Sequence, residues 1–399
     1  MPIRRVDQVE LAGKRVFIRV DFNVPLNEKR EITDDTRIVS SLPTIQFVCE
    51  AGGKVILASH LGRPKGKRDL KYSLAPVAER LSRMLGRRVF IAPDCAGEEV
   101  QRQIGGLKEG EVMLLENLRF HPEEEKNDES FSRALASLCD VYINDAFGAA
   151  HRAHASTEGM TRYVPIVACG FLMMKEIENL ERAIVNPQKP YVAILGGAKV
   201  SDKIGVIQNL LDKVTTILIG GGMAYTFLKA KGYQVGKSLV EEDQVHFSKN
   251  LLEQARGKVN LLLPSDHVAA ERMELEARRE VVKNDHIPEG WVCLDIGPET
   301  IKVFSEEILS AKTIFWNGPM GVFEMEPFSH GTFSIARTIA RSSAFSIVGG
   351  GDSVAALNRA GVADKIGHIS TGGGASLELI EGKKLPGVEA LRRNGGEMG

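Results

Sequence analysis

Two glycine triplets, each placed directly after an apolar run, could do chemistry in this chain. They lie in SIVGGGDSVAAL, residues 346–357, and in ISTGGGASLEL, residues 369–379. Glycine allows close backbone approach, and a glycine-rich helix start leaves N–H groups free to bind a phosphate. A tight structural turn is the alternative for either triplet, but a turn needs only one or two glycines. The pair therefore indicates backbone that binds phosphate groups.

Charged side chains near these glycines fit a polyphosphate. Asp352 follows the first triplet and is the kind of hard oxygen ligand that Mg²⁺ takes together with phosphate oxygens, although it could also cap a helix. Lys199 and Lys203 lie four residues apart in LGGAKVSDKIG, which predicts that they share one face of an opening helix. Two cations on one face would suit a chain of phosphates.

A third glycine-containing stretch of the second half could hold the rest of a nucleotide. WNGPMGVFE, residues 316–324, offers Asn317 and Glu324 to a ribose and Pro319 and Val322 as an apolar wall. GGGMAYTF, residues 220–227, adds a further glycine turn that could line the same cleft. Neither G-x-x-x-x-G-K-[ST] nor G-x-G-x-x-G occurs in the chain, so the P-loop, dinucleotide and protein-kinase fingerprints are absent.

The first half has a different chemistry, because basic and polar side chains follow its apolar runs. Up to residue 170 the chain has 17 Arg and 8 Lys, whereas the remainder has 10 Arg and 16 Lys. The planar fork of arginine binds carboxylate or phosphate through two parallel hydrogen bonds. Solvated basic loops and structural histidines are the alternatives. The residues that would hold a small anion are Asp21, Asn23, Arg37, His60, Arg63, Arg119, Arg152 and the neighbouring His151 and His154.

The elements that must position these side chains are short apolar runs that alternate with amphipathic stretches. Examples are RVFIRV at 15–20 and KVILAS at 54–59 in the first half, and YVAIL at 191–195 and FSIVGG at 345–350 in the second. Near-continuous apolar runs are typical of parallel strands covered on both faces, whose ligands gather at the carboxyl ends. The pattern predicts an α/β protein with two parallel sheets and a helix between them, near residues 170–187.

Composition narrows the class of protein. The chain has 399 residues, long enough for two domains, and its formal charge of −1 favours neither nucleic acid nor membranes as partners. No run approaches the roughly 20 apolar residues of a membrane span, and no apolar signal core is present, so we expect a cytoplasmic protein. The five cysteines lie far apart in the sequence, so we expect them to be buried free thiols. Three histidines raise the possibility of a metal site, but they form no recognised metal-binding motif.

Eight motifs together resemble phosphoglycerate kinase of the bacterial type. In chain order they are VDFNVP, SHLGRP, LENLRF, DAFGAAHRAHAS, LGGAKVSDKI, WNGPMGVFE, GGGDS and STGGGAS. The resemblance implies two doubly wound parallel-sheet domains joined by a helical hinge. It implies a phosphoglycerate-binding domain at 1–170 with a C-terminal tail at 388–399, a hinge helix at 171–187, and a nucleotide-binding domain at 188–387. Because no long exposed apolar stripe is evident in the sequence, we also expect a monomer.

The family pattern also implies a role for each matching residue. It assigns 3-phosphoglycerate to Asp21, Asn23, Arg37, His60, Arg63, Arg119 and Arg152. It assigns ADP or ATP to Gly197, Lys203, Gly221, Asn317, Pro319, Glu324, Gly350, Gly351, Asp352 and Ser353, with Mg²⁺ at Asp352. It assigns stabilisation of the transferred phosphoryl group to Arg37, Lys199, Gly372 and Gly373. Residues 266–295 receive no role beyond part of an adenine pocket.

The implied reaction is a reversible, Mg-dependent transfer between 1,3-bisphosphoglycerate and ADP. A carboxylate acceptor is already deprotonated at neutral pH, so no general base is expected. Two other classes remain open. A dehydrogenase shares glycine turns and α/β halves, but the dinucleotide fingerprint is missing. A catalytically silent binding protein would keep the same pockets, although the presence of Lys199, Asp352 and Arg37 argues for activity.

Overall fold

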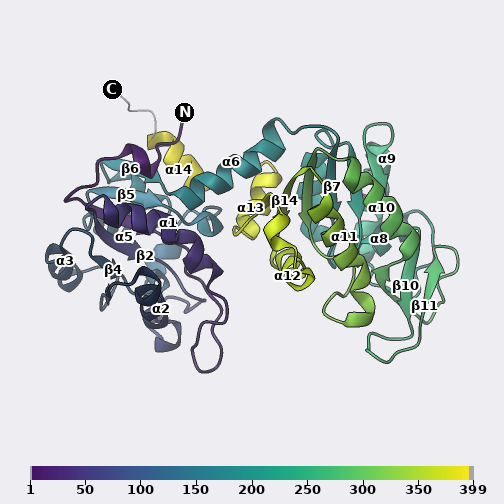
Figure 1. The fold of residues 1–399 in the computed structure, drawn as a ribbon, viewed down its shortest axis with the longest axis horizontal. Coiled ribbons are helices and arrows are strands. Elements are labelled where there is room, and N and C mark those ends of the chain that lie inside the picture. The colour runs from purple at the N-terminus through teal and green to yellow at the C-terminus, as the bar shows by residue number, and fades with distance from the viewer. Residues whose placement is uncertain (1, 395–399) are drawn as a thin grey trace. The chain divides into compact units, whose positions relative to one another are not determined.

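The chain folds into two compact units, each built on its own parallel sheet (Figure 1). The computed structural model describes residues 2–394. One unit contains the chain up to Glu178 and again from Lys384, and the other is Asn179–Lys383. Both sheets have six strands with surrounding helices, so the predicted fold class, two parallel-sheet α/β domains, is confirmed.

The sheet of the first unit has the strand order β3-β4-β2-β1-β5-β6, with every pair parallel. Its strands are β1 (Arg15–Arg19), β2 (Lys54–Ala58), β3 (Val89–Ile91), β4 (Val112–Leu114), β5 (Val141–Asn144) and β6 (Ile166–Cys169). The side chains of the central strands are buried almost throughout, as expected of a sheet covered on both faces. All carboxyl ends therefore meet at one edge.

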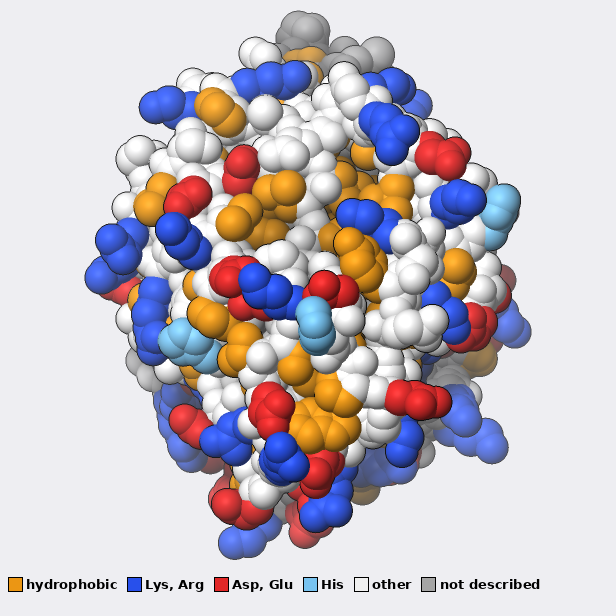
Figure 2. Space-filling view, turned by 90° about the vertical axis from the view of Figure 1, so that its right-hand side faces the viewer, with side chains coloured by type: hydrophobic (Ala, Val, Ile, Leu, Met, Phe, Trp, Pro, Cys, Tyr) orange, Lys and Arg blue, Asp and Glu red, His pale blue; other side chains and the backbone are white. Residues whose placement is uncertain are grey.

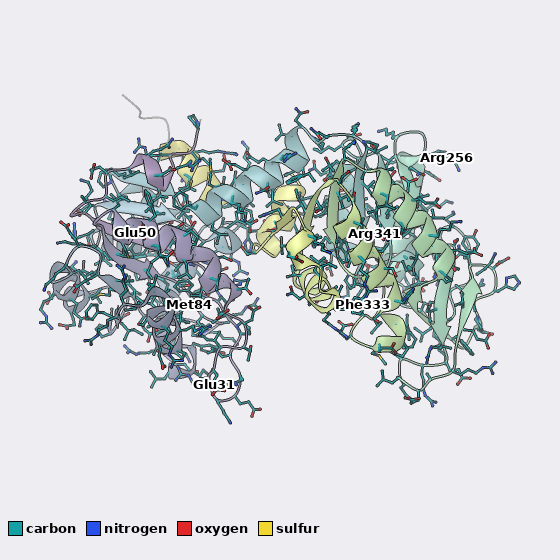
Figure 3. All side chains as sticks on the ribbon, in the orientation of Figure 1. Glu31, Glu50, Met84, Arg256, Phe333 and Arg341 are labelled. Atoms are coloured by element: carbon teal, nitrogen blue, oxygen red, sulfur yellow. The ribbon has the colours of Figure 1, made fainter. Side chains whose placement is uncertain are left out.

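The helices of the first unit that precede residue 171 are α1 (Thr36–Glu50), α2 (Ala75–Leu85), α3 (Glu98–Gly105), α4 (Pro122–Glu125) and α5 (Glu129–Ala136). Two of them have a recognisable end signal. Asp128 caps α5 by accepting the Phe131 N–H at 2.9 Å, and α2 ends at Gly86 in the left-handed region with φ of 63°. Glu50, the last residue of α1, is exposed, whereas Met84 packs partly against the core (Figure 3).

The second unit repeats the parallel architecture in the order β15-β14-β13-β7-β8-β9. Its strands are β7 (Tyr191–Leu195), β8 (Thr216–Ile219), β9 (Asn260–Leu262), β13 (Thr313–Asn317), β14 (Phe345–Gly349) and β15 (His368–Ile369). Its helices are α7 (Ile204–Leu210), α8 (Met223–Ala230), α9 (Val245–Ala255), α10 (Pro298–Ser310), α11 (His330–Arg341), α12 (Gly351–Ala360) and α13 (Gly374–Ile380). The central strands β7 and β13 are buried at all positions.

An antiparallel sheet in the second unit does not follow from the apolar runs of the sequence. It consists of β10 (Asp266–Ala270), β11 (Arg279–Lys283) and β12 (Val292–Ile296), in the order β11-β10-β12. These strands lie in the region from Asp266 onward for which we predicted no secondary structure from the sequence. Since β11 is exposed at four of its five residues, its sequence lacks the apolar signature of a buried strand.

Two helices lie where the chain passes between the first and the second unit. α6 (Phe171–Val185) contains the boundary between the units, which follows Glu178. α14 (Pro386–Asn394) lies in the first unit, where it packs against β6 and where the Gly387 N–H donates to the Ala150 carbonyl at 2.9 Å. Residues 395–399 of the predicted C-terminal tail lie outside the described residues.

The surface carries mixed charges. The face of the second unit shown in Figure 2 has acidic and basic side chains interspersed over it, in keeping with the formal charge of −1. Arg341, at the end of α11, is an exposed basic side chain of the second unit (Figure 3). All five cysteines are free and buried, as expected. Among the described residues, no helix is both long and apolar enough to cross a bilayer.

Candidate active site

The predicted anion-binding residues of the first unit come from loops that follow neighbouring parallel strands. Asp21 and Asn23 follow β1, and His60 and Arg63 follow β2. The Asn23 side chain links these two loops, because its Oδ1 accepts the Gly62 N–H at 2.8 Å. The carboxyl-edge rule for parallel sheets thus brings residues about 40 positions apart in the sequence into contact.

A charged pair joins the β1 loop to the first turn of α1. The Arg37 guanidinium hydrogen-bonds the Asp21 carboxylate, which is 7% exposed. Burial alone would raise the pKa of Asp21, but the neighbouring His60 and the charges of Arg37 and Arg19 outweigh it and hold the pKa below its ordinary value. Asp21 is therefore ionised at neutral pH. It orients Arg37, whose side chain remains 34% exposed and can reach a ligand.

The other three arginines differ in how firmly they are held. Arg119 follows β4, is buried, donates through Nη1 to the Gly62 carbonyl at 2.9 Å, and lies 3.2 Å through Nε from Glu125. Arg152 follows β5 and is half-buried, and its Nε donates to His151 Nε2 at 3.2 Å. Arg63 is exposed and makes no hydrogen bond or ion pair with the described residues of this group.

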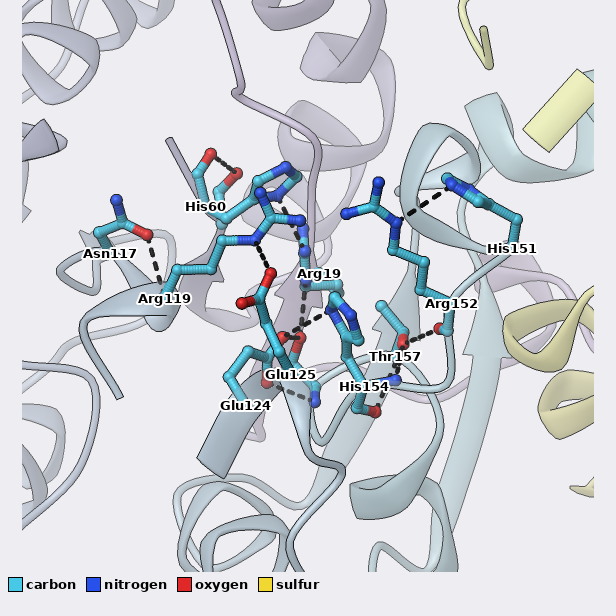
Figure 4. Close-up of polar contacts among 12 residues, drawn as sticks. Arg19, His60, Asn117, Arg119, Glu124, Glu125, His151, Arg152, His154 and Thr157 are labelled. Atoms are coloured by element: carbon cyan, nitrogen blue, oxygen red, sulfur yellow. Dashed lines mark hydrogen bonds and ion pairs between the residues drawn. The ribbon is translucent and has the colours of Figure 1, made fainter. Parts of the chain in front are cut away.

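A buried layer beneath these residues was missed by the sequence analysis (Figure 4). Arg19, the last residue of β1, is 1% exposed and donates to Ser156 Oγ at 2.8 Å. That hydroxyl donates to the fully buried Glu124 at 2.5 Å, and the Ser156 N–H donates to the same carboxylate at 2.9 Å. An arginine inside the apolar run RVFIRV was the signal that could have revealed this layer, since buried arginines need partners.

The glycine loops of the second unit pack backbone against backbone beyond the carboxyl ends of β7, β8 and β13. Gly197 donates to the Pro319 carbonyl and Gly221 to the Met320 carbonyl, each at 3.0 Å. Gly221 has φ of +67°, and a Cβ there would come within 2.6 Å of the Gly197 nitrogen. Glycine is therefore required at 221 for both its conformation and its close approach.

These loops enclose a pocket of about 340 Å³. Its wall is largely apolar, and residues from the β10–β11 connection and from β12 contribute to it. Five of the residues assigned to the nucleotide line this pocket: Gly197, Gly221, Pro319, Glu324 and Asp352. Val322, expected as apolar wall, and Met273, Val292 and Leu294 of the antiparallel sheet region line it as well. Size, glycine edges and apolar walls suit a flat base.

Other assigned residues lie behind the pocket and hold its loops together. The buried Asn317 donates to the Gly349 carbonyl at 2.7 Å and accepts a hydrogen bond from Lys203. The fully buried Ser353 accepts the Gly318 N–H at 2.7 Å. Burial lowers the pKa of Lys203 from its ordinary value. Gly350, with φ of 92°, immediately precedes α12, so its conformation also suits glycine.

The prediction that Lys199 and Lys203 share a helix face is wrong. Residues 196–200 are not helical, the 3₁₀ turn covers Ser201–Lys203, and α7 begins at Ile204. Glu241 explains why the helix begins later than predicted, because its carboxylate accepts the Val200 N–H at 2.5 Å and the Ser201 N–H at 3.1 Å. Lys199 is consequently exposed on a loop, whereas Lys203 points inward to Asn317.

The second glycine triplet and Asp352 stand at helix starts. Gly373, with φ of 53°, precedes α13. The Gly372 N–H already donates to Ser370 Oγ at 3.2 Å. This second triplet therefore has one N–H group fewer available for a phosphate than its sequence indicates. Asp352 is exposed in the first turn of α12 and lines the pocket. An accessible carboxylate at the edge of this pocket is the kind of oxygen ligand that Mg²⁺ prefers.

Comparison with known proteins decides the family. A family model described as phosphoglycerate kinase matches residues 6–383. The chain belongs to the phosphoglycerate kinase family. Curated phosphoglycerate kinases of Moorella thermoacetica and of Geobacter metallireducens are 60% and 58% identical to it. The alignment with the Moorella protein covers 96% of this chain and 97% of that protein. The alignment with the Geobacter protein covers 99% of this chain and 100% of that protein.

Solved structures of phosphoglycerate kinases agree in fold with this family member. The enzyme of Coxiella burnetii superposes with a TM-score of 0.91 at 42% identity, covering 98% of this chain and 99% of its own. The enzyme of Pyrococcus horikoshii OT3 gives a TM-score of 0.85 at 34% identity, covering 99% and 100%. The resemblance drawn from eight motifs is thus confirmed, as is the phosphotransferase class it implied.

Proposed function

We propose that this chain transfers a phosphoryl group between 1,3-bisphosphoglycerate and ADP, yielding 3-phosphoglycerate and ATP. This reversible glycolytic reaction is the activity of the phosphoglycerate kinase family, to which the chain belongs. The observation that carries the proposal is the family match, which spans both the anion-binding and the nucleotide-binding residues. We further propose that the protein works as a cytoplasmic monomer with domains divided as the sequence analysis describes.

The acid substrate would bind in the first unit. There Asp21, Asn23, His60 and Arg119 are already connected by contacts across three loops, which supports a common binding site. Arg37, Arg63 and Arg152 keep accessible guanidinium groups that could bind the phosphate and carboxylate of phosphoglycerate. The net positive charge of this group of residues would balance the acid substrate.

The nucleotide would bind in the second unit, with its base in the pocket near Gly221 and its phosphates toward Lys203 and the start of α12. Asn317 acts chiefly by holding Lys203 and the Gly349 carbonyl, and Glu324 is placed to bind the ribose. Asp352 would hold Mg²⁺, which when bound offsets phosphate charge and orients the phosphate chain.

The chemical step needs alignment and charge stabilisation, not proton abstraction, because the accepting carboxylate is already ionised. Arg37 of the first unit and Lys199 of the second would approach the equatorial oxygens of the transferred group. The Gly373 N–H would assist, with Gly372 joining if its bond to Ser370 is exchanged. Since the two sets belong to different units, we propose closure about α6 once both substrates are bound.

A coupled assay that detects ATP from ADP and 1,3-bisphosphoglycerate tests the function. We expect Mg-dependent ATP formation with the purified chain. If the folded protein forms no ATP, the proposal is wrong and a catalytically silent binding protein is the remaining interpretation. Hydride transfer with a nicotinamide cofactor would instead indicate a dehydrogenase.

Replacing Asp352 by Asn should raise the Mg²⁺ concentration that gives half-maximal activity. Even indirect ligand partners change metal affinity 10- to 100-fold, so losing the carboxylate should cost at least about 10-fold. A Mg²⁺ titration of the rate at fixed ADP measures this. Asp364→Asn, in the turn after α12, is the matched control. An Asp352→Asn titration that overlays that of the control would rule out the proposed ligand.

A further inference from the structure

Arg19 is a buried cation whose hydrogen bonds reach the substrate-binding histidine. It ends β1 at 1% exposure, and its Nη2 lies 3.1 Å from His60 Nδ1 (Figure 4). None of the roles assigned from the family pattern uses it. Its side chain is covered, so it has no route to contact a ligand directly.

This contact settles which ring nitrogen of His60 carries the hydrogen. A guanidinium has five N–H donors, no acceptor, and stays protonated in proteins. Nδ1 of His60 must therefore accept, which requires a neutral imidazole with its hydrogen on Nε2. Among the described residues, no hydrogen bond occupies Nε2 of His60, so this N–H is left for a ligand.

We propose that Arg19 is a positioning residue that holds His60 in the neutral Nε2–H form, so that His60 offers a permanent hydrogen-bond donor to the acid substrate. The inference deepens the proposed function and rests on it for the identity of that acid. A neutral donor of fixed direction can bind a carboxylate or phosphate oxygen without gaining or losing a proton as the pH changes.

Arg19 is itself held on three sides. Its Nη1 donates to the Val20 carbonyl and its Nε to Ser156 Oγ at 2.8 Å. Ser156 in turn donates to Glu124, which is fully buried and lies near His154, with 3.8 Å between Oε1 and Nδ1. The guanidinium plane therefore has little freedom, and the direction of its bond to His60 is fixed.

The charges facing His60 favour the same neutral form. Asp21, from the β1 loop, would raise the pKa of His60. Burial and the cations Arg19, Arg119 and Arg37, from β1, the β4 loop and α1, lower it and together hold the pKa well below its ordinary value. His60 is therefore expected to stay neutral over the physiological range, with Arg19 selecting the tautomer.

The direct test is the ¹⁵N spectrum of the histidine side chains in the wild-type protein without substrate. His60→Gln identifies the His60 resonances among those of the nine histidines. We expect a pyridine-like Nδ1 and a pyrrole-like Nε2 whose shifts do not change between pH 6 and pH 8. A pyrrole-like Nδ1, or a ring that titrates in this range, would overturn the inference. No activity enters this measurement, so its failure is distinguishable from failure of the proposed function.

A charge-balanced pair of variants tests the role of Arg19. Arg19→Met combined with Glu124→Gln removes the buried cation and its acidic neighbour together, and Glu124→Gln alone is the comparator. In the double variant we expect mixed tautomers, whereas burial and the cations Arg119 and Arg37 should still hold the pKa of His60 below its ordinary value. Since a ring with its hydrogen on Nδ1 offers the acid a lone pair in place of the Nε2–H donor, KM for 3-phosphoglycerate should rise at least about threefold relative to the comparator. Unchanged His60 resonances in a folded double variant would contradict a positioning role.

Discussion

Lys199→Ala is expected to lower the rate of ATP formation at saturating substrates by about 10²- to 10³-fold, by analogy with removal of one oxyanion-stabilising donor. Lys199 lies exposed on the loop after β7, and no hydrogen bond or ion pair with another described residue holds its ammonium group. Its charge is therefore free to act on the phosphoryl group, where stabilisation of the transition state would exceed that of the bound substrates.

Because Lys199 has no structural partner, the substitution should leave the free energy of unfolding nearly unchanged. Lys302→Ala, which removes an equally exposed lysine from α10, is the matched control and should keep full activity. Steady-state rates with both substrates saturating, together with urea unfolding curves, measure the two quantities. A Lys199→Ala rate within a few-fold of the control would exclude the assigned role.

Arg37→Ala should reduce turnover by a similar factor, about 10²- to 10³-fold, for the same electrostatic reason. It has a second consequence, because Arg37 is one of the cations that hold down the pKa of Asp21. Without it, one of the lowering charges is lost and the pKa of Asp21 should rise. The residual activity should therefore decrease at acidic pH more steeply than that of the wild type, as Asp21 becomes protonated.

The measurement is turnover against pH at saturating substrates. Arg102→Ala, which breaks an exposed pair with Glu99 on α3, controls for loss of an arginine in the same unit. Arg37→Lys should recover only part of the rate, since an ammonium group cannot reproduce the two parallel bonds of the guanidinium. Full turnover of Arg37→Ala would contradict the assignment of this residue to the transferred group.

The sequence predicted the parallel sheets because their strands are buried on both faces and so appear as continuous apolar runs. It also predicted that Asp21, His60 and Arg119 would meet, since parallel strands bring their carboxyl ends to one edge. The same reasoning failed for strands without an apolar signature. β11 is the clear case, because four of its five residues are exposed and only Val282 is buried, so its sequence does not resemble a covered strand.

Within the site, the failures concern interactions between residues distant in sequence. Lys199 and Lys203 have helical spacing, but Glu241 binds the backbone N–H groups that a helix start would use. Arg19 appears as part of a strand, and only the fold places it beneath His60 and beside Ser156. Spacing predicts local geometry, whereas these contacts depend on how separate loops pack.

Small-angle scattering of the wild-type protein tests most directly whether transfer depends on bringing the two units' binding sites together. We predict that the radius of gyration decreases when 3-phosphoglycerate and a non-hydrolysable ATP analogue with Mg²⁺ are both bound, and changes much less with either alone. Identical scattering profiles with and without both ligands, at concentrations that saturate both sites, would contradict the account.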